Sequence, residues 1–188
     1  MIHIPRGYRG IKHETIGADL LALYAAVMMP EQILGKQMAA RLKSRKPEAW
    51  YPIVEVLEPL EELGRKLGAD SLRKVGSTIF HAGPAEIVRR TITSARDLAY
   101  GFDRLYRMAN RGQEIGSWTV IEFKEGSAVL EKTTPHHCSM EEGILDAAFR
   151  AINAPATVHQ SACLRNGADA CRFVLTSHVV DHRWTGRK

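Results

Sequence analysis

Hydrophobic residues recur at a helical period through the first two thirds of the chain. Apolar side chains spaced three or four residues apart predict helices over 17–29, 31–43, 50–67 and 70–82, and a long helix from 84 to about 110. Pro30 is expected to close the first of these helices, and Pro59 to kink the third or divide it into two shorter helices. The longest helix in the chain is expected to be the last of the series.

After Gly112 the period changes from about 3.6 residues to 2. Residues 117–134 are typical of two strands around a turn at 124–127, and residues 156–163 and 170–177 of a second hairpin. Between them lies a helix that Ser139 and Glu142 would open as a capping box. The sequence therefore predicts an α+β fold: N-terminal helices followed by β-β-α-β-β, with a four-stranded, mainly antiparallel sheet packed by helices.

This pattern suggests a division of the chain into three parts. Residues 1–44 would form an N-terminal arm with helices, residues 45–180 an α/β domain that binds a ligand, and residues 181–188 a flexible tail. The histidines near the two ends, His3, His13, His178 and His182, are expected on the surface.

Bulk composition is that of a folded, water-soluble protein of 188 residues, with 45% hydrophobic and 25% charged residues. No apolar run approaches the roughly 20 residues of a membrane span, and the start lacks the pattern of a signal peptide. The net charge of +5 comes from cations dispersed among carboxylates, which does not favour a nucleic-acid partner. Three cysteines, an odd number, favour reduced thiols in the cytoplasm over a disulfide framework.

These cysteines, Cys138, Cys163 and Cys171, carry the main functional indication. Cys163 and Cys171 flank the turn of the second hairpin, and Cys138 lies at the start of the preceding helix. If that helix packs against the hairpin, the three sulfurs converge. Three thiolates and one further nitrogen or oxygen ligand suit tetrahedral zinc. Reduced structural thiols are the alternative reading, because buried free cysteines are common in protein cores.

The string CLRNGADACRF, preceded by Cys138 and a helix, resembles the C-terminal signature of vinyl-reductase-type ligand-binding domains. This superfamily includes the sensor domains of aromatic-responsive activators, and it is related to haem nitric-oxide-binding and trafficking domains. The resemblance covers roughly residues 45–178. It implies an α/β module that binds a small molecule and is frequently a homodimer.

In the aromatic sensors, the resemblance implies a zinc ion held by three cysteines and a glutamate. Cys138, Cys163 and Cys171 match the cysteines, but Gln160 occupies the position of the glutamate. His159 is the fourth ligand that we expect, with His136 and His137 as alternatives. Zinc is therefore the expected metal, and haem or another tetrapyrrole ranks behind it, since His81 is the one candidate axial ligand that the sequence suggests.

The same resemblance places a pocket tryptophan at Trp118, although a tryptophan on a strand also suits a plain core position. We expect a small apolar or aromatic ligand between the long helix and the sheet. The expected contacts are Leu98, Phe102, Tyr106, Arg90, Trp118 and Val158. Arg90 lies near the position where the sensors have a histidine, so an anionic or a fully apolar ligand is as consistent with the sequence as a phenol.

No nucleophile elbow, phosphate loop or other catalytic constellation occurs in the chain. The leading hypothesis is a cytoplasmic small-molecule sensor whose cysteine-rich metal site is structural and which signals through a homodimer or a regulatory partner protein. One alternative is an enzyme or enzyme subunit like the tetrapyrrole (4-vinyl) reductases, based on fold-level analogy alone. Another is an assembly scaffold like the trafficking relatives, which would have no open cavity.

Overall fold

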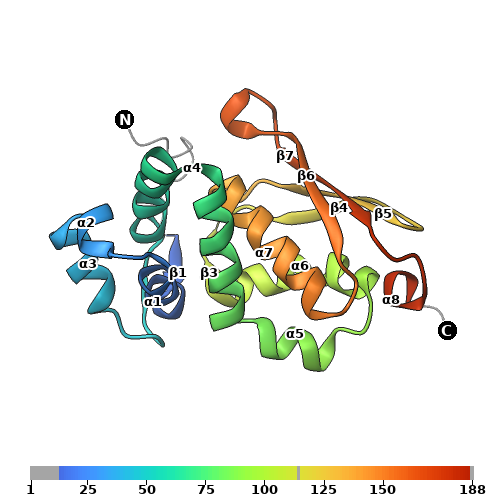
Figure 1. Ribbon diagram of the computed structural model, residues 1–188, viewed down its shortest axis with the longest axis horizontal. Coiled ribbons are helices and arrows are strands. Elements are labelled where there is room, and N and C mark those ends of the chain that lie inside the picture. Colours follow the sequence, from blue (N-terminus) through green and yellow to red (C-terminus); the bar gives the residue numbers. More distant parts are fainter. Residues whose placement is uncertain (1–12, 114, 187–188) are drawn as a thin grey trace.

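The structure, a computed structural model, describes residues 13–113 and 115–186. A helical lobe at the N-terminal side and a sheet lobe at the C-terminal side lie on either side of a long helix, α4 (Val54–Ala82) (Figure 1). The helical lobe contains β1 (Glu14–Ile16), α1 (Gly17–Ala26), α2 (Pro30–Ile33), α3 (Lys36–Lys43) and β2 (Trp50–Pro52). Residues 1–12, which include His3, lie outside the described part of the chain.

The helices of this lobe are shorter than their apolar periods predicted. Pro30 does not close α1, which ends at Ala26, but is the first residue of α2. This is where proline fits best, because the first turn of a helix needs no N–H from that residue. The expected helix over 31–43 is divided into α2 and α3 by Gly35, whose φ of 85° lies in the left-handed region that a helix cannot continue through.

Helix α4 joins two of the predicted helices into one element. Pro59 lies within it on helical backbone, and the break falls at Gly68 instead, with φ 77° and ψ −176°. Gly68 thus ends the first predicted helix as expected, although the second follows without an intervening loop.

The predicted long helix from 84 to 110 is wrong, because the structure divides it into α5 (Ala85–Thr91) and α6 (Ala95–Ala109). Ile92 adopts extended backbone, and the Ser94 side chain accepts a hydrogen bond from the Asp97 backbone N–H, so that a new helix starts there. A serine followed by an acid three residues later, here Ser94 and Asp97, is a signal for the start of a helix. The apolar pattern continues across it and therefore concealed it. The longest helix is α4.

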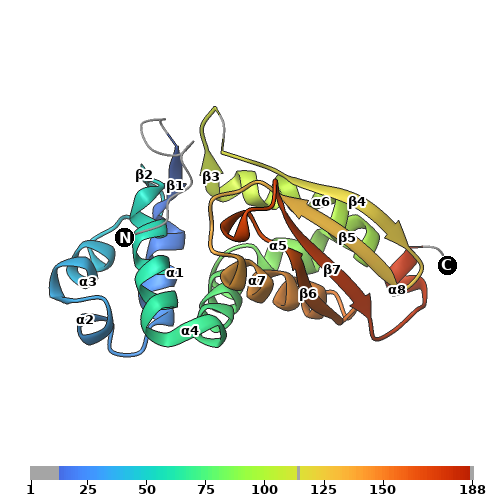
Figure 2. The same cartoon turned by 90° about the horizontal axis from the view of Figure 1, so that it is seen from above.

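The sheet lobe has the predicted β-β-α-β-β order. Its strands are β4 (Trp118–Lys124), β5 (Ser127–Lys132), β6 (Ala156–Ala162) and β7 (Cys171–Ser177), and α7 (Cys138–Ala151) lies between the hairpins. The strand order is β4-β5-β7-β6, and all neighbouring strands are antiparallel. Helices α6 and α7 cover one face of the sheet (Figure 2). The α+β fold class predicted from the sequence is confirmed.

A small second sheet connects the two lobes. β1 pairs with β2 on one side and with β3 (Asn110–Arg111), which follows α6, on the other. His13, next to β1, is buried rather than exposed as expected, with 2% of its surface accessible. This sheet holds the start of α1 beside the end of α6, which places the two helices at opposite walls of the space between the lobes.

The start of α7 differs from the predicted capping box. Its cap is His137, whose ring accepts a hydrogen bond from the Ser139 N–H, and the helix begins at Cys138. Glu141 and Glu142, adjacent acids near the start of this helix, are nevertheless buried, with 3% and 8% of their surfaces accessible. Glu142 pairs with Arg73 of α4. Glu142 is covered because α7 packs against α4 over an extensive contact, the largest between any two elements described, whereas Glu141 pairs with Lys132 at the end of β5.

Two hydrophobic clusters fill the lobes and meet at α4 and α7. The helical lobe has a core of aliphatic side chains from α1, α3 and α4, and the sheet lobe has an aromatic-rich core from α6, α7 and the sheet. Ile144 of α7 packs against both clusters. The division of the chain at residues 44 and 45 that the sequence suggested stays a prediction, and α4 contributes to both cores.

Residues 181–186, expected within a flexible tail, include the short helix α8 (His182–Thr185). Trp184 of this helix is fully buried, stacks on Phe123 and donates an indole hydrogen bond of 2.7 Å to the Lys124 carbonyl. The sequence gives no sign of this packing, because a single apolar residue such as Trp184 produces no periodic pattern. His178 and His182 are exposed, as expected.

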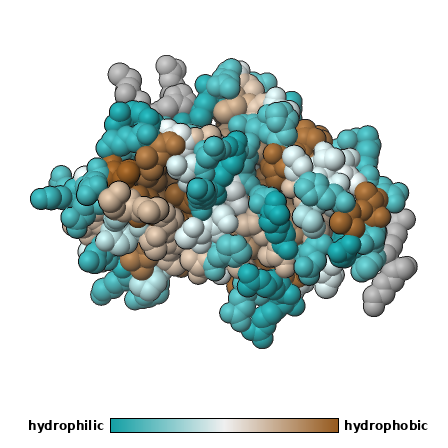
Figure 3. Space-filling model, viewed as in Figure 1, coloured by the Kyte–Doolittle hydropathy of each residue, from teal (hydrophilic) through white to brown (hydrophobic). Residues whose placement is uncertain are grey.

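On the face shown in Figure 3, apolar residues form separate patches among hydrophilic ones. The large apolar side chains exposed at the surface include Met28 and Met29, between α1 and α2. Among the described residues, no helix is both long enough and apolar enough to cross a membrane.

Candidate functional site

A pocket of about 240 Å³ lies between the two lobes. One wall comes from α1 of the helical lobe and from α4, and the opposite wall from α6, β3, β4 and α7. Its surface is mainly apolar and includes Val56, Ile79, Phe80, Phe102, Leu105, Trp118, Met140 and Ile144. The rings of Phe102 and Trp118 meet edge to face at 4.8 Å, which fixes both against the pocket wall.

Three of the six residues predicted to contact a ligand line this pocket: Phe102, Tyr106 and Trp118. The other three do not. Leu98 is fully buried in the sheet-lobe core, Arg90 is exposed on α5 and pairs with Glu86, and Val158 lies on β6 beside a separate polar cleft. Arg90 and Leu98 were placed near the pocket by the wrong assumption of one continuous helix from 84 to 110.

The pocket also contains polar side chains that the sequence analysis did not assign to it. Asp19, in the first turn of α1, lines the pocket, and burial raises the pKa of its carboxyl group from 3.8 to about 7. Asn110 is 4% exposed, and its Oδ1 has no hydrogen-bond partner, while its amide N–H donates to the Tyr106 carbonyl. His136 is 6% exposed, and its Nδ1 is likewise without a hydrogen bond.

A buried ion pair lies behind the pocket wall. Lys132, at the end of β5, is 1% exposed and pairs with Glu141, while it donates a hydrogen bond of 2.7 Å to the His136 carbonyl. Thr134 donates a second hydrogen bond to Glu141. Burial, followed by the nearby Lys132 charge, lowers the pKa of His136 to about 3, so its ring is neutral at physiological pH.

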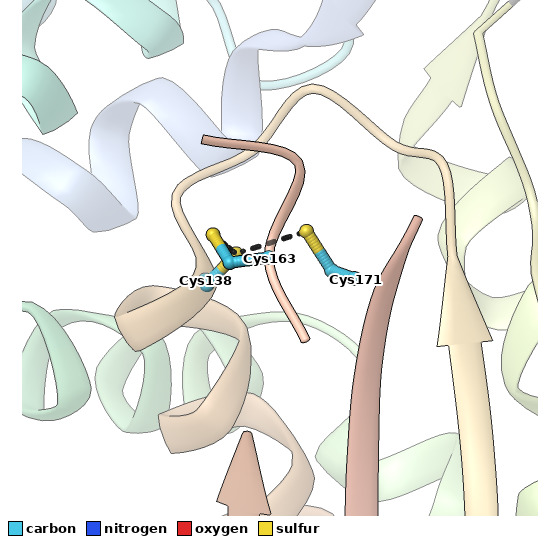
Figure 4. Close-up of side chains that lie close together, drawn as sticks. All are labelled: Cys138, Cys163 and Cys171. Carbon is cyan, nitrogen blue, oxygen red and sulfur yellow. Dashed lines mark hydrogen bonds between the residues drawn. The ribbon is translucent and has the colours of Figure 1, made fainter. Parts of the chain in front are cut away.

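The three cysteines converge as predicted, from α7, the end of β6 and the start of β7 (Figure 4). The Cys138 sulfur lies 3.3 Å from that of Cys171 and 3.7 Å from that of Cys163, and all three lie within 4.8 Å of one another. A tetrahedral zinc ion with 2.3 Å bonds requires sulfur separations of about 3.8 Å. The cluster is therefore close to the geometry of three zinc ligands, without any disulfide.

The surroundings of the cluster favour a thiolate at Cys171. A hydrogen bond from Cys138 lowers the pKa of the Cys171 thiol, and the nearby Lys132 charge and a hydrogen bond from the Leu164 N–H lower it further. The Cys138 pKa is raised, because its thiol donates that hydrogen bond. A cation bound to the three sulfurs would therefore have as one of its ligands a thiol, Cys171, whose pKa is already lowered.

The structure does not bring the predicted fourth ligand to the cluster. His159 is exposed on β6, and the group of possible metal ligands found among the described residues contains the three cysteines only. Gln160 donates its amide hydrogen to the Ala162 carbonyl, and the Nδ1 of His137 caps α7. Three protein ligands leave a fourth position to water or another molecule.

Arg165 links the cysteine cluster to the helical lobe. It belongs to the 3-10 turn η2 (Leu164–Asn166) between β6 and β7, and it pairs with Glu61 of α4. Both side chains are largely buried, with 21% and 16% of their surfaces accessible. Since α4 also lines the pocket, the cluster and the pocket share one helix.

The sequence held a signal for Asp19 but none for Asn110. Asp19 is the one charged residue in the apolar run from 18 to 29, so an unusual environment could have been suspected. Asn110 enters the pocket only because β3 pairs with β1, which is a contact between segments 95 residues apart. No local pattern reports such a pairing.

No protein-family model matches the chain, and no curated protein matches its sequence. Solved structures do match in fold, and among them are H-NOX proteins. One from S. oneidensis in the Fe(II) ligation state has a TM-score of 0.67 at 15% identity, and the match covers 90% of this chain and 99% of that one. A mutant H-NOX protein from K. algicida, Fe(II) unliganded, has a TM-score of 0.64 at 14% identity, with 87% and 97% coverage. A third structure concerns haem distortion in the H-NOX family and has a TM-score of 0.62 at 11% identity, with 88% and 96% coverage.

At these identities the likeness shows a shared fold. It agrees with the part of the sequence resemblance that concerned haem nitric-oxide-binding domains, whereas no comparison supports the vinyl-reductase-type part. The fold therefore raises haem as a ligand to be tested against the residues of this chain.

The described lining of the pocket does not fit haem. His136 could offer a ring nitrogen, but the volume of 240 Å³ is below the roughly 300–1,000 Å³ of pockets for drug-sized ligands. Haem also carries anionic propionates, which need cations or solvent. Among the described residues, the lining contains two carboxyl groups, Asp19 and Glu141, and no lysine or arginine.

Proposed function

We propose that the protein is a small-molecule sensor or binding module whose ligand occupies the pocket between the lobes. The observation that carries this proposal is an apolar pocket at the junction of two separate cores, lined by a few buried polar atoms without partners. Such a combination is typical of binding sites, because an unpaired polar group in a core costs stability unless a ligand or water satisfies it. The volume favours a compact ligand over a tetrapyrrole.

The position of the pocket supports a sensing role. α1 and α4 on one side and α6 and α7 on the other contact the same space. If the lobes can adopt two arrangements, a ligand that touches both walls would favour one of them. The equilibrium between the two arrangements would shift by the difference in the ligand's affinity for them. The signal would pass to a partner protein or across a homodimer, and both partners stay predictions.

A pocket-filling substitution tests the proposal. We expect compact aromatic probes such as indole, phenol or 2-phenylethylamine to raise the melting temperature of the protein by about 3 °C or more at saturating concentration. Ala18→Phe would abolish the shift, since Ala18 lines the pocket. Ala25→Phe is the matched control, because Ala25 is exposed on the same helix.

If no probe shifts the melting temperature, or if Ala18→Phe leaves the shift unchanged, the pocket is not the ligand site. A haem absorption band in the purified protein that is lost in Ala18→Phe would contradict the proposal of a compact ligand and identify haem as the ligand of the pocket. A pocket of this kind counts against the assembly-scaffold alternative, for which no open cavity was expected.

We also propose that the cysteine cluster holds zinc in a structural role. The sulfur separations and the lowered pKa of the Cys171 thiol support a bound zinc ion, with water as its fourth ligand. The site joins the start of α7 to both ends of the β6–β7 turn, so that metal binding would stabilise the tip of the hairpin. No sequence or structural feature assigns this site a reaction.

Cys171→Ser should lower zinc content and stability together. We expect zinc per chain, measured by elemental analysis, to fall from about one to near zero, and the melting temperature to fall by about 5 °C or more, because metal binding contributes directly to folding free energy. A chelator should lower the melting temperature of the wild type and leave that of the variant unchanged. Wild-type protein free of zinc and insensitive to the chelator would show that the cluster consists of reduced structural thiols.

A further inference from the structure

Three polar side chains in the pocket can accept hydrogen bonds or attract positive charge. Asp19 offers a carboxylate, and Asn110 offers Oδ1, which is buried and has no hydrogen-bond partner, while its Nδ2 donates to the Tyr106 carbonyl. His136 adds a ring nitrogen, Nδ1, without a hydrogen-bond partner. The described lining has no cationic side chain.

Three ligand classes can be compared with this lining. An anion would face the Asp19 and Glu141 carboxyl groups without a cation in the wall. A fully apolar ligand would fill the space but leave Asn110 Oδ1 without a hydrogen bond and would offer no charge to the Asp19 carboxyl group that lines the pocket. A ligand with a protonated amine can donate hydrogen bonds to Asn110 Oδ1 and to the Asp19 carboxylate. Its positive charge and the negative charge of Asp19 then offset part of each other's cost of burial.

The aromatic walls support the same choice. Phe80, Phe102 and Trp118 line the pocket, and the faces of aromatic rings attract organic cations as well as other rings. An inorganic cation is not favoured, since the only group of three or more possible metal ligands found among the described residues is the cysteine cluster. The lining therefore suits a compact organic molecule with an apolar body and one cationic end.

We propose that the pocket selects compact aromatic amines, with Asp19 as the counter-ion of the ammonium group and Asn110 Oδ1 as a second acceptor. This inference rests on the proposed function and specifies its ligand class. The body of the ligand lies against Phe102 and Trp118, and its charged end lies toward α1 and β3, where the two acceptors belong. Asp19 is then retained for binding although it costs stability in the free protein.

Three probes with the same ring and chain length separate the classes: 2-phenylethylamine, propylbenzene and 3-phenylpropanoate. At pH 8 we expect calorimetric titration to show 2-phenylethylamine binding about tenfold or more tightly than propylbenzene, and no binding of 3-phenylpropanoate. Asp19→Asn should weaken the amine about tenfold and leave propylbenzene within about twofold. Asp70→Asn is the control, since Asp70 is exposed on α4 and does not line the pocket.

The outcomes separate this inference from the function on which it rests. Equal affinity for propylbenzene and the amine, or an amine affinity that Asp19→Asn does not change, would overturn selection for amines and leave the pocket as a ligand site. Absence of binding by all three probes would contradict both. The comparison of probes on the wild type needs no variant, so it decides the matter even if Asp19→Asn were poorly folded.

Discussion

Gly143→Ala should lower the free energy of unfolding by about 3 kcal/mol or more, although it only adds one methyl group. Gly143 of α7 and Gly76 of α4 lie where the two helices cross. A Cβ at Gly143 would overlap the Arg73 carbonyl oxygen, and one at Gly76 would overlap the Met140 carbonyl oxygen. Both obstacles are backbone atoms, so only a separation of the helices can relieve the overlap.

Chemical denaturation of Gly143→Ala and Gly101→Ala measures this effect. Gly101 is also helical, in α6, but the nearest atom to an added Cβ is the Ile92 Cδ1 at 3.9 Å, which is ordinary contact. Gly101→Ala should therefore stabilise the protein by about 0.5–1 kcal/mol, through helix propensity. Equal stability of the two variants would contradict the close packing of α4 on α7, and with it the fixed distance between the pocket walls.

Asp19→Asn should make the protein more stable at pH 8 by about 2–4 kcal/mol and have little effect at pH 4. The pKa of Asp19 is raised from 3.8 to about 7, because burial disfavours its charged form. Below pH 3.8 the group is protonated in both the folded and the unfolded chain. As the pH rises from about 4 to 7, the unfolded chain ionises first, so stability is lost over this interval and the loss is complete above about pH 7.

Urea unfolding from pH 4 to pH 8 measures the difference between wild type and variant. Taking that difference removes the contribution of the other titrating groups, including those that line the same pocket, Tyr106, His136 and Glu141. Asp70→Asn should change stability by less than about 1 kcal/mol at every pH, since its ion pair with Arg73 is exposed. A difference for Asp19→Asn that does not vary with pH would mean that this carboxyl group is solvated and that the α1 wall of the pocket is open.

Much of the fold follows from local patterns, and the errors have identifiable physical causes. Both hairpins and α7 were predicted within a few residues, because period-2 strands bounded by turn residues leave few alternatives. The helix from 84 to 110 was wrong because its apolar period continues across the Ser94 cap. Gly35 was overlooked for the same reason, although only its positive φ separates α2 from α3.

For the candidate site, the sequence predicts the cysteine cluster but only part of the pocket. Convergence of the cysteines was predictable, because a hairpin brings Cys163 and Cys171 together and a helix that packs back returns Cys138. The pocket was only half predictable. Phe102, Tyr106 and Trp118 were identified on the sheet side, but the opposite wall depends on how α1 packs against α4, and on the β1–β3 pairing that places Asn110.

The central claim, that the space between the lobes is a binding site for a compact molecule, is tested most directly by locating such a molecule. Crystals soaked with 4-bromobenzylamine can be measured at the bromine absorption edge, where the heavy atom gives a signal of its own. We expect the bromine peak inside the pocket, against the wall that Phe102 and Trp118 form, and the amine beside Asp19. Bromine only at the protein surface, with the space between α1 and α6 empty or filled by protein side chains, would contradict the account.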